Sequence, residues 1–138
     1  MQPFDVEPII AGDDCAVLRI EGEIDAYAAP QIFARVTDLA GNGIVHVIAD
    51  LRGAGFLDSA GLGALVGSRT GLSARGGSLV LVASADRILQ TIRITGLSEV
   101  FALHSCVLDA ITADQHWKAA VCGESDSAED WCRKHGLL

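Results

Sequence analysis

Asp58 and Ser59 are the residues in this 138-residue chain whose types and position are best suited to chemistry. They follow an apolar run at 45–51 and a glycine-containing stretch at 52–57, and a helical hydrophobic pattern begins just after them. This order predicts a buried strand, then a loop, then the N-terminus of a helix. A helix N-terminus offers unpaired N–H groups and positive partial charge, which suit an anion. We therefore take Ser59 as the leading functional residue.

Other roles compete for this serine. Asp and Ser are favoured at helix N-termini for backbone capping alone, and the residue types by themselves favour that interpretation. A serine nucleophile needs a nearby base and a glycine two positions before and after it, but position 57 is leucine. The sequence places none of its histidines to pair with Ser59; they are His46, His104, His116 and His135. Gly61 and Gly63 are too irregularly placed for a dinucleotide fingerprint, so we expect no enzyme, cofactor or metal.

The charge and hydropathy of the chain limit the kinds of partner that it can bind. The formal net charge is -8 and no basic cluster interrupts it, so we expect no binding to nucleic acid or to an anionic membrane. No apolar run reaches the roughly 18–20 residues that span a bilayer, and the first residues lack the pattern of a signal peptide. We expect a soluble, cytoplasmic protein whose cysteines are thiols that serve as small packing residues. They are Cys15, Cys106, Cys122 and Cys132.

The order of apolar segments predicts a single α/β domain. Two β-prone segments form an opening hairpin, and a central strand without alternation is expected to be buried on both faces. Asp25 can cap the first helix and Gly41 can end it, while Ser84 and Ser105 are the expected caps of later helices. The predicted strands are 6–11, 15–22, 44–51, 78–83 and 100–103, and the longer predicted helices are 26–39 and 59–75. The order ββαβαβαβα implies a mostly parallel sheet after the hairpin.

The predicted helix at 59–75 carries glycines at every fourth position. Gly63, Gly67 and Gly71 therefore share one face of that helix. Each costs about 1 kcal/mol relative to alanine in a helix interior, so we expect something to approach this face closely. The domain's own sheet is the favoured neighbour, and the backbone of a partner is the alternative.

The helical and strand patterns weaken after Asp114, and we interpret residues 115–138 as a C-terminal extension that is partly helical and of unknown role. A short helix is expected at 127–135, with Ser127 as its cap, acidic residues in its first turn and basic residues in its last. Trp117 and Trp131 are the side chains expected to pin the extension to the domain.

Several blocks of residues, in the right order, resemble the STAS domain and, within it, the bacterial anti-sigma factor antagonists. The blocks are Gly22-Glu23-Ile24-Asp25, Asp50-Leu51, Phe56-Leu57-Asp58-Ser59-Ala60-Gly61-Leu62-Gly63, and Thr95-Gly96-Leu97 ahead of Val100-Phe101. The resemblance implies one STAS-type domain at 1–114. Its expected fold is a mixed, mostly parallel sheet of about four to five strands, with an N-terminal β-hairpin and about four helices packed mainly on one side.

The resemblance also implies a function. In this family the serine at the helix start, here Ser59, is phosphorylated by an anti-sigma factor that is a serine kinase. The unphosphorylated form binds that kinase and releases the sigma factor, and a serine phosphatase resets the switch. Ala60 is a departure, because many relatives carry a second Ser or Thr there. The residues expected to contact the partner are Asp25, Asp58, Ser59, Gly61, Leu62 and Gly63.

Two other functions stay open on the sequence alone. A non-catalytic STAS adaptor subunit of a signalling or transport complex would use Ser59 only as a helix cap. A small hydrolase would turn over an activated ester and lose that turnover in Ser59→Ala. A weak homodimer is also left open.

Overall fold

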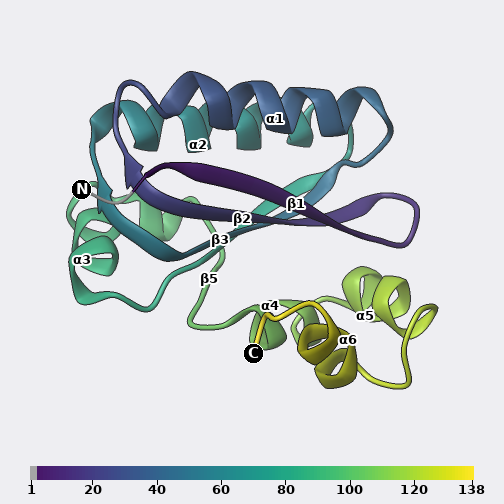
Figure 1. Ribbon diagram of the computed structural model, residues 1–138. Helices are drawn as coiled ribbons and strands as arrows, with labels where there is room; N and C mark the ends of the chain where they lie inside the picture. Colours follow the sequence, from purple (N-terminus) through teal and green to yellow (C-terminus); the bar gives the residue numbers. More distant parts are fainter. Residues whose placement is uncertain (1–2) are drawn as a thin grey trace.

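A five-stranded mixed sheet forms the centre of the computed structural model, which describes residues 3–138 (Figure 1). The strands are β1 (Asp5–Ala11), β2 (Cys15–Ile24), β3 (His46–Leu57), β4 (Ser78–Val82) and β5 (Leu103–His104). They lie in the order β1-β2-β3-β4-β5. The β1–β2 hairpin is antiparallel and every other pair is parallel. The expected α/β fold with an N-terminal hairpin is confirmed.

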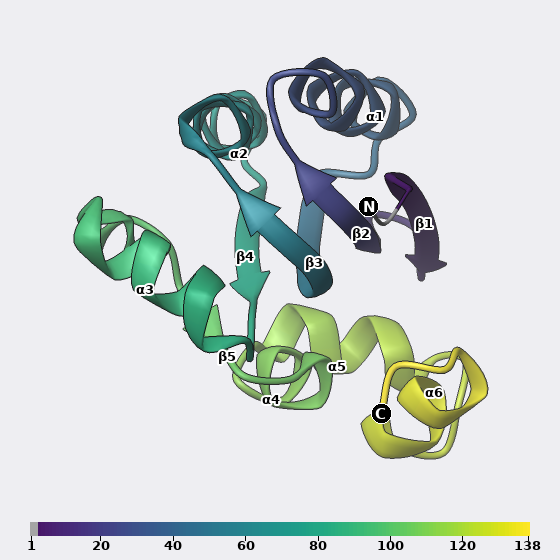
Figure 2. The same ribbon diagram turned by 60° about the vertical axis from the view of Figure 1, so that its left-hand side comes forward.

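Helices cover both faces of this sheet. They are α1 (Ala29–Gly41), α2 (Ser59–Ser73), α3 (Asp86–Ile94), α4 (Val107–Thr112), α5 (Gln115–Cys122) and α6 (Ala128–Lys134), with a 3₁₀ turn η1 (Leu97–Glu99). Figure 2 shows α1 and α2 above the sheet and α4, α5 and α6 below it. Two separate clusters of buried side chains result, one beneath α1, α2 and α3 and the other against α4, α5 and α6.

β3 supplies side chains to both clusters. Val47, Ala49 and Leu51 belong to the cluster under α1 and α2, whereas Ile48 belongs to the cluster under the later helices. Successive side chains on a strand point to opposite faces, so an unbroken apolar run is required where both faces are covered. The prediction that this strand is buried on both faces is confirmed.

Some predicted element boundaries are wrong. Residues 52–57 were expected to be a loop, but β3 continues through them because they pair with the second half of β2. Helix α3 begins after Ala85 without a side-chain cap, so Ser84 does not cap it. Cys106 rather than Ser105 caps α4, since its Sγ accepts a hydrogen bond of 3.4 Å from the amide of Asp109.

The predicted strand at 100–103 is also wrong except at its last residue. Phe101 donates its amide proton to the Leu97 carbonyl at 2.9 Å, so this stretch closes the turn that η1 begins. Gly96 has a φ of 77°, the left-handed conformation expected after a helix C-terminus. Pairing with β4 begins only at Leu103.

The glycine face of α2 does not pack on the sheet, contrary to the favoured expectation. The helix meets the sheet through a leucine stripe that includes Leu62, Leu65 and Leu72. A Cβ built on Gly67 would lie 3.3 Å from the ring of Phe33 in α1, so this face turns toward the neighbouring helix. A Cβ on Gly71 would have no described atom within 4 Å.

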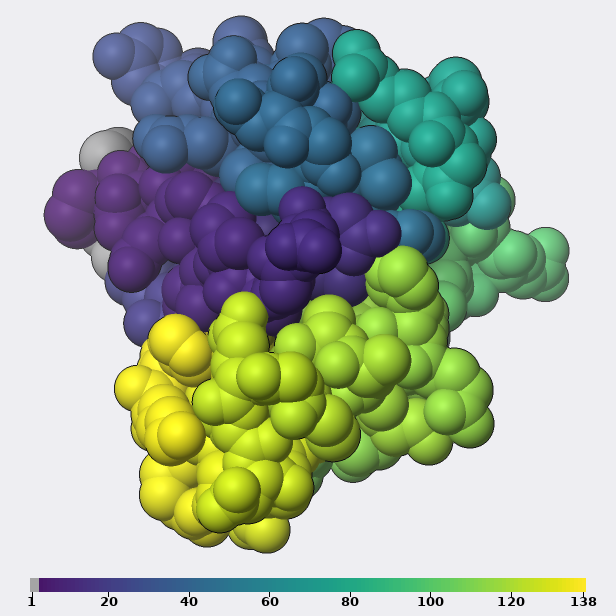
Figure 3. Space-filling model, turned by 90° about the vertical axis from the view of Figure 1, so that its right-hand side faces the viewer, coloured from purple at the N-terminus to yellow at the C-terminus, as the bar shows by residue number. Residues whose placement is uncertain are grey.

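The extension at 115–138 packs under the sheet. Trp117 and Trp131 are fully buried there, as expected, and Figure 3 shows the segment as a layer against the purple N-terminal strand. Trp131 donates from Nε1 to the Glu124 carboxylate at 2.9 Å. The predicted helix is confirmed as α6, with Ser127 Oγ accepting from the amide of Asp130.

Two arginines hold the end of the extension to the sheet. Arg52 of β3 pairs with the buried carboxylate of Asp50 through two bonds of 2.9 and 3.0 Å, and it also donates to the Leu137 carbonyl at 2.9 Å. Arg19 of β2 donates to the Gly136 carbonyl at 2.6 Å. The last residues are thus bonded to two strands more than 80 residues away in the chain.

Trp131→Ala should lower the free energy of unfolding of the whole domain by about 3–5 kcal/mol, because it leaves a cavity in the second cluster and removes one of the two donors to the Glu124 carboxylate, the other being the Gly12 amide. Tyr27→Ala is the matched control; this aromatic side chain is 81% exposed and its loss should change stability by about 0.5 kcal/mol or less. Urea unfolding followed by circular dichroism measures both. An unchanged main transition in Trp131→Ala would show that the extension is an independent appendage.

Candidate functional site

The start of α2 is fixed to the end of β2. Ile24 pairs with Leu57 in the parallel β2–β3 ladder, and the next amide, that of Asp58, donates to the Ile24 carbonyl at 3.2 Å. The Asp58 carboxylate then accepts from the amide of Gly61 at 3.0 Å, which makes Asp58 the N-cap of α2. We call this arrangement of Ile24, Asp58 and Gly61 the strand–helix joint.

Gly61 is buried at the joint because the helix approaches β2 too closely for a side chain. A Cβ at this position would lie 2.7 Å from the Ile24 carbonyl oxygen and 2.7 Å from the Ile24 side chain. Gly63, one half-turn later, is exposed and open. The two glycines therefore have different roles: one sets a contact and the other leaves a surface bare.

Ser59 is the first residue of α2 and is exposed. Its neighbour Asp58 is half-buried by its capping bond, and Leu62 is 7% exposed and faces the core. Of the residues predicted to meet a partner, Ser59 and Gly63 are thus exposed and Asp58 is partly so. Gly61 and Leu62 lie behind them and hold the helix in place.

Asp25 lies at the same end of the sheet as Ser59, since it follows β2 as Asp58 follows β3. Figure 2 shows the arrowheads of β2 and β3 pointing together toward the loops that begin α1 and α2. Asp25 does not cap α1, whose N-cap is Ala28. Its carboxylate instead accepts from the amides of Tyr27 and Ala28, both at 3.0 Å, and so shapes the turn before the helix.

Two exposed aromatic side chains at this end of the sheet were missed. Tyr27 is 81% exposed in the turn after β2, and Phe56 is 40% exposed on β3, where it pairs with Glu23. Exposed aromatic residues next to polar ones are typical of protein-binding surfaces. If residues 52–57 had been interpreted as a strand, the alternation of side chains between core and solvent would have predicted that Leu57 is buried and Phe56 exposed. Tyr27 has no such signal.

One cluster elsewhere has the composition of a metal site. The ligand atoms of Asp14, Cys15 and His116 lie within 4.8 Å of one another. Burial, followed by the charge of Asp14, raises the pKa of the Cys15 thiol to about 12, so it carries a proton at neutral pH and is a poor ligand. The His116 ring bonds both carboxylate oxygens of Asp14, at 2.9 and 3.0 Å. This arrangement fits an ion pair that joins α5 to the β1–β2 turn.

Several histidines and cysteines make contacts away from Ser59. His46 bonds Ser78 at 3.1 Å, and the His135 ring packs on Trp131. The cysteines are free, as predicted, and Cys15 and Cys132 pack in the second core cluster. Within residues 3–138, every helix is too short or too polar to cross a membrane.

A family model described as the STAS domain matches residues 9–110, from the end of β1 into α4. The chain belongs to the STAS domain family. The anti-sigma-B factor antagonist of Listeria monocytogenes is 40% identical over 85 residues, which cover 61% of this chain and 74% of that protein. The anti-sigma-B factor antagonist of Bacillus subtilis is 37% identical over 83 residues, covering 60% and 75%.

The crystal structure of an anti-sigma factor antagonist from Mycobacterium paratuberculosis is similar to this chain. It has a TM-score of 0.69 and 28% sequence identity, and the match covers 82% of this chain and 93% of that one. The residues of the strand–helix joint all fall inside the matched family region, whereas α5 and α6 lie beyond it. The predicted family is therefore confirmed.

Gly61→Ala and Gly63→Ala should change stability in opposite directions. The first forces a methyl group against the Ile24 carbonyl and should cost about 1–3 kcal/mol. The second adds helix propensity in open space and should gain up to about 1 kcal/mol. Thermal unfolding of the two variants measures this, and equal effects would contradict the close approach at the joint.

The pair of Asp14 and His116 predicts a pH dependence. Hydrogen bonding to His116 holds the pKa of Asp14 below its usual value of 3.8. The pair therefore stabilises the fold above about pH 4, and this contribution is lost as the pH falls through the lowered pKa. Asp14→Asn should lose about 0.2–1 kcal/mol at pH 5, since the pair is partly exposed, and a smaller amount at pH 3, where protonation of Asp14 has begun to weaken the pair.

Asp13→Asn is the control for this measurement, because Asp13 is the exposed neighbour on the same turn. Unfolding in urea at both pH values gives the comparison. A loss in Asp14→Asn that is as large at pH 3 as at pH 5 would rule out the ion pair as its source.

Proposed function

We propose that this STAS protein is an anti-sigma factor antagonist whose unphosphorylated form binds an anti-sigma factor and frees a sigma factor. The observation that carries the proposal is Ser59, an exposed hydroxyl at the first residue of α2, on a joint that other residues hold in place. The anti-sigma factor is expected to be a serine kinase that phosphorylates Ser59, and a serine phosphatase is expected to reverse the modification.

The capping arrangement supports a regulatory rather than a structural serine. Asp58 caps α2 through the amide of Gly61, and Leu62 donates to the Asp58 carbonyl at 3.0 Å. The helix start is therefore stabilised without the Ser59 hydroxyl. The adaptor alternative, in which Ser59 serves only as a cap, loses its main argument.

A phosphate on Ser59 suits the helix start. Phosphoserine carries about -1.5 to -2 charge, and the first-turn amides of Ser59 and Ala60 together with the helix dipole favour an anion there. The joint behind it is held by the Asp58 amide and carboxylate and by the close packing of Gly61, none of which involves the hydroxyl. Phosphorylation is therefore expected to leave the fold in place.

The same phosphate would change the surface that a partner meets. Asp25 and Asp58 already place carboxylates at this end of the sheet, with Tyr27 and Phe56 exposed nearby in sequence. Adding charge beside them raises the cost of desolvating the surface and repels an acidic partner group. Phosphorylation would thus end binding by charge.

The named relatives support this class of partner. The proteins from Listeria monocytogenes and Bacillus subtilis are both anti-sigma-B factor antagonists, at 40% and 37% identity. We further propose that the chain acts in the cytoplasm as a binding protein and kinase substrate rather than as an enzyme.

Kinase assays provide the test. Incubating the protein with its cognate anti-sigma factor and ATP should label Ser59, as mapped by mass spectrometry, and Ser59→Ala should take up no label. Titration calorimetry with the anti-sigma factor should show that Ser59→Ala binds as the unmodified protein does. Ser59→Asp should bind about tenfold or more weakly, as expected for an added charge in an interface.

The outcomes separate the alternatives. Equal affinity of the unmodified protein, Ser59→Ala and Ser59→Asp would contradict the charge switch. Label on another residue, or none, would contradict the phosphorylation site and favour an adaptor. Ester turnover that disappears in Ser59→Ala would favour the hydrolase.

A further inference from the structure

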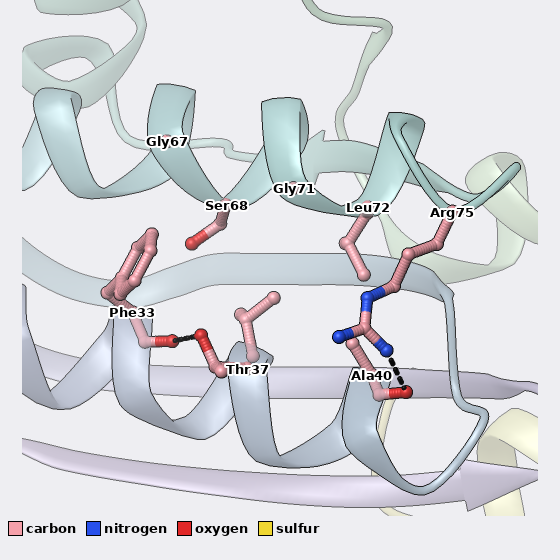
Figure 4. A pocket seen from close by; sticks show the side chains of 9 residues that line it. Phe33, Thr37, Ala40, Gly67, Ser68, Gly71, Leu72 and Arg75 are labelled. Atoms are coloured by element: carbon pink, nitrogen blue, oxygen red, sulfur yellow. Dashed lines mark hydrogen bonds between the residues drawn. The ribbon is translucent and has the colours of Figure 1, made fainter.

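A groove runs between α1 and α2 on the outer surface of the helical layer (Figure 4). The groove is partly open to solvent and has a volume of about 140 Å³. Phe33, Val36, Thr37 and Ala40 of α1 line one side, and Gly67, Ser68, Gly71, Leu72 and Arg75 line the other. The groove is therefore mainly apolar, with a hydroxyl along one wall and a guanidinium at one end.

Ser68 is a buried polar residue without a partner. It is 3% exposed, and its hydroxyl has no hydrogen-bond partner within residues 3–138. Thr37 and Thr70, on the same two helices, each bond a carbonyl one turn earlier, at 2.8 and 3.0 Å. Figure 4 shows the Ser68 hydroxyl directed into the groove instead. A buried hydroxyl left unpaired is unfavourable, so this one is suited to a ligand.

The glycines keep the groove open. Gly67 touches Phe33, but Gly71 faces open space, and alanine there would both fit and favour the helix. Packing within residues 3–138 therefore gives no reason for a glycine at this position. A side chain at Gly71 would instead project into the groove that it lines.

Arg75 supplies a positive charge at one end. Its Nη1 donates to the Ala40 carbonyl at 2.9 Å, and Figure 4 shows the rest of the guanidinium beside the cavity. An arginine held in this way presents its remaining N–H groups to a carboxylate. Ser68 lies within α2, whereas Arg75 lies in the turn that follows the helix, so the hydroxyl and the guanidinium line different parts of the groove.

We propose that this groove binds a small apolar carboxylate that carries a hydroxyl at its opposite end. The carboxylate would pair with Arg75, the hydroxyl would bond Ser68, and the body would lie between Phe33 and Gly71. A cavity of about 150 Å³ in another protein accommodates benzene, so one aromatic ring fits the volume here. 4-Hydroxybenzoate is the simplest probe of this class. The proposal does not depend on phosphorylation of Ser59.

Titration of the full chain, followed by backbone amide NMR, tests the groove. 4-Hydroxybenzoate should bind saturably with a dissociation constant near or below about 1 mM, as expected for a ligand of this size. The shifted amides should be those of the α1–α2 groove. Benzoate, which lacks the hydroxyl, should bind about fivefold more weakly. Phenol, which lacks the carboxylate, should bind about tenfold more weakly.

Variants assign each contact. Ser68→Ala should abolish the preference for 4-hydroxybenzoate over benzoate, whereas Ser73→Ala, an exposed serine on the same helix, should keep it. Arg75→Gln should weaken both carboxylates about tenfold and leave phenol unchanged. Gly71→Leu should fill the groove and remove binding while the thermal unfolding transition is retained.

Two results would overturn the proposal. One is the absence of saturable binding at 4-hydroxybenzoate concentrations up to about 10 mM. A specific site for a ligand of this size should bind more tightly than that. The other is binding that neither Ser68→Ala nor Arg75→Gln alters. If Gly71→Leu does not fold, these two variants still decide the outcome.

Discussion

The close approach of α2 to the end of β2 is the constraint on which the rest of this structure depends. Only glycine at position 61 lets the helix backbone reach the Ile24 carbonyl, and Asp58 bonds both partners across that contact. The direction of α2 follows from this joint. Its leucine stripe then lies on the sheet, its glycine face turns toward α1, and Ser59 is left exposed at the first turn.

The second face of the sheet is covered by the later helices rather than by solvent. The tryptophans of the extension are buried in a cluster with side chains of β2 and β3. Arg19 and Arg52 donate hydrogen bonds to the carbonyl groups of the last residues of the extension. This face lies across the sheet from α1 and α2, which carry the joint and the groove. Both faces of the sheet are thus covered by helices.

The sequence predicted the sheet, the helix start and the cap well because these depend on local patterns. The apolar run at 45–51, the Asp58 cap and the Ser127 cap can each be predicted from a few neighbouring residues. Boundaries were wrong where distant partners decide them. β3 extends to Leu57 because β2 pairs with it. The packing partner of the α2 glycines was predicted wrongly because four-residue spacing shows that they share one face of the helix but not which element lies against that face. Tyr27 could not be found from periodicity, since it lies in a turn.

The central claim is that Ser59 changes the charge of this surface while the joint keeps its shape. Backbone amide NMR of the protein phosphorylated at Ser59, compared with the unmodified protein, tests this most directly. We expect shifts confined to the ends of β2 and β3 and the first turn of α2, with the core amides of the sheet and of α5 and α6 unchanged. Shifts that spread through the sheet, or loss of the α2 signals, would contradict it.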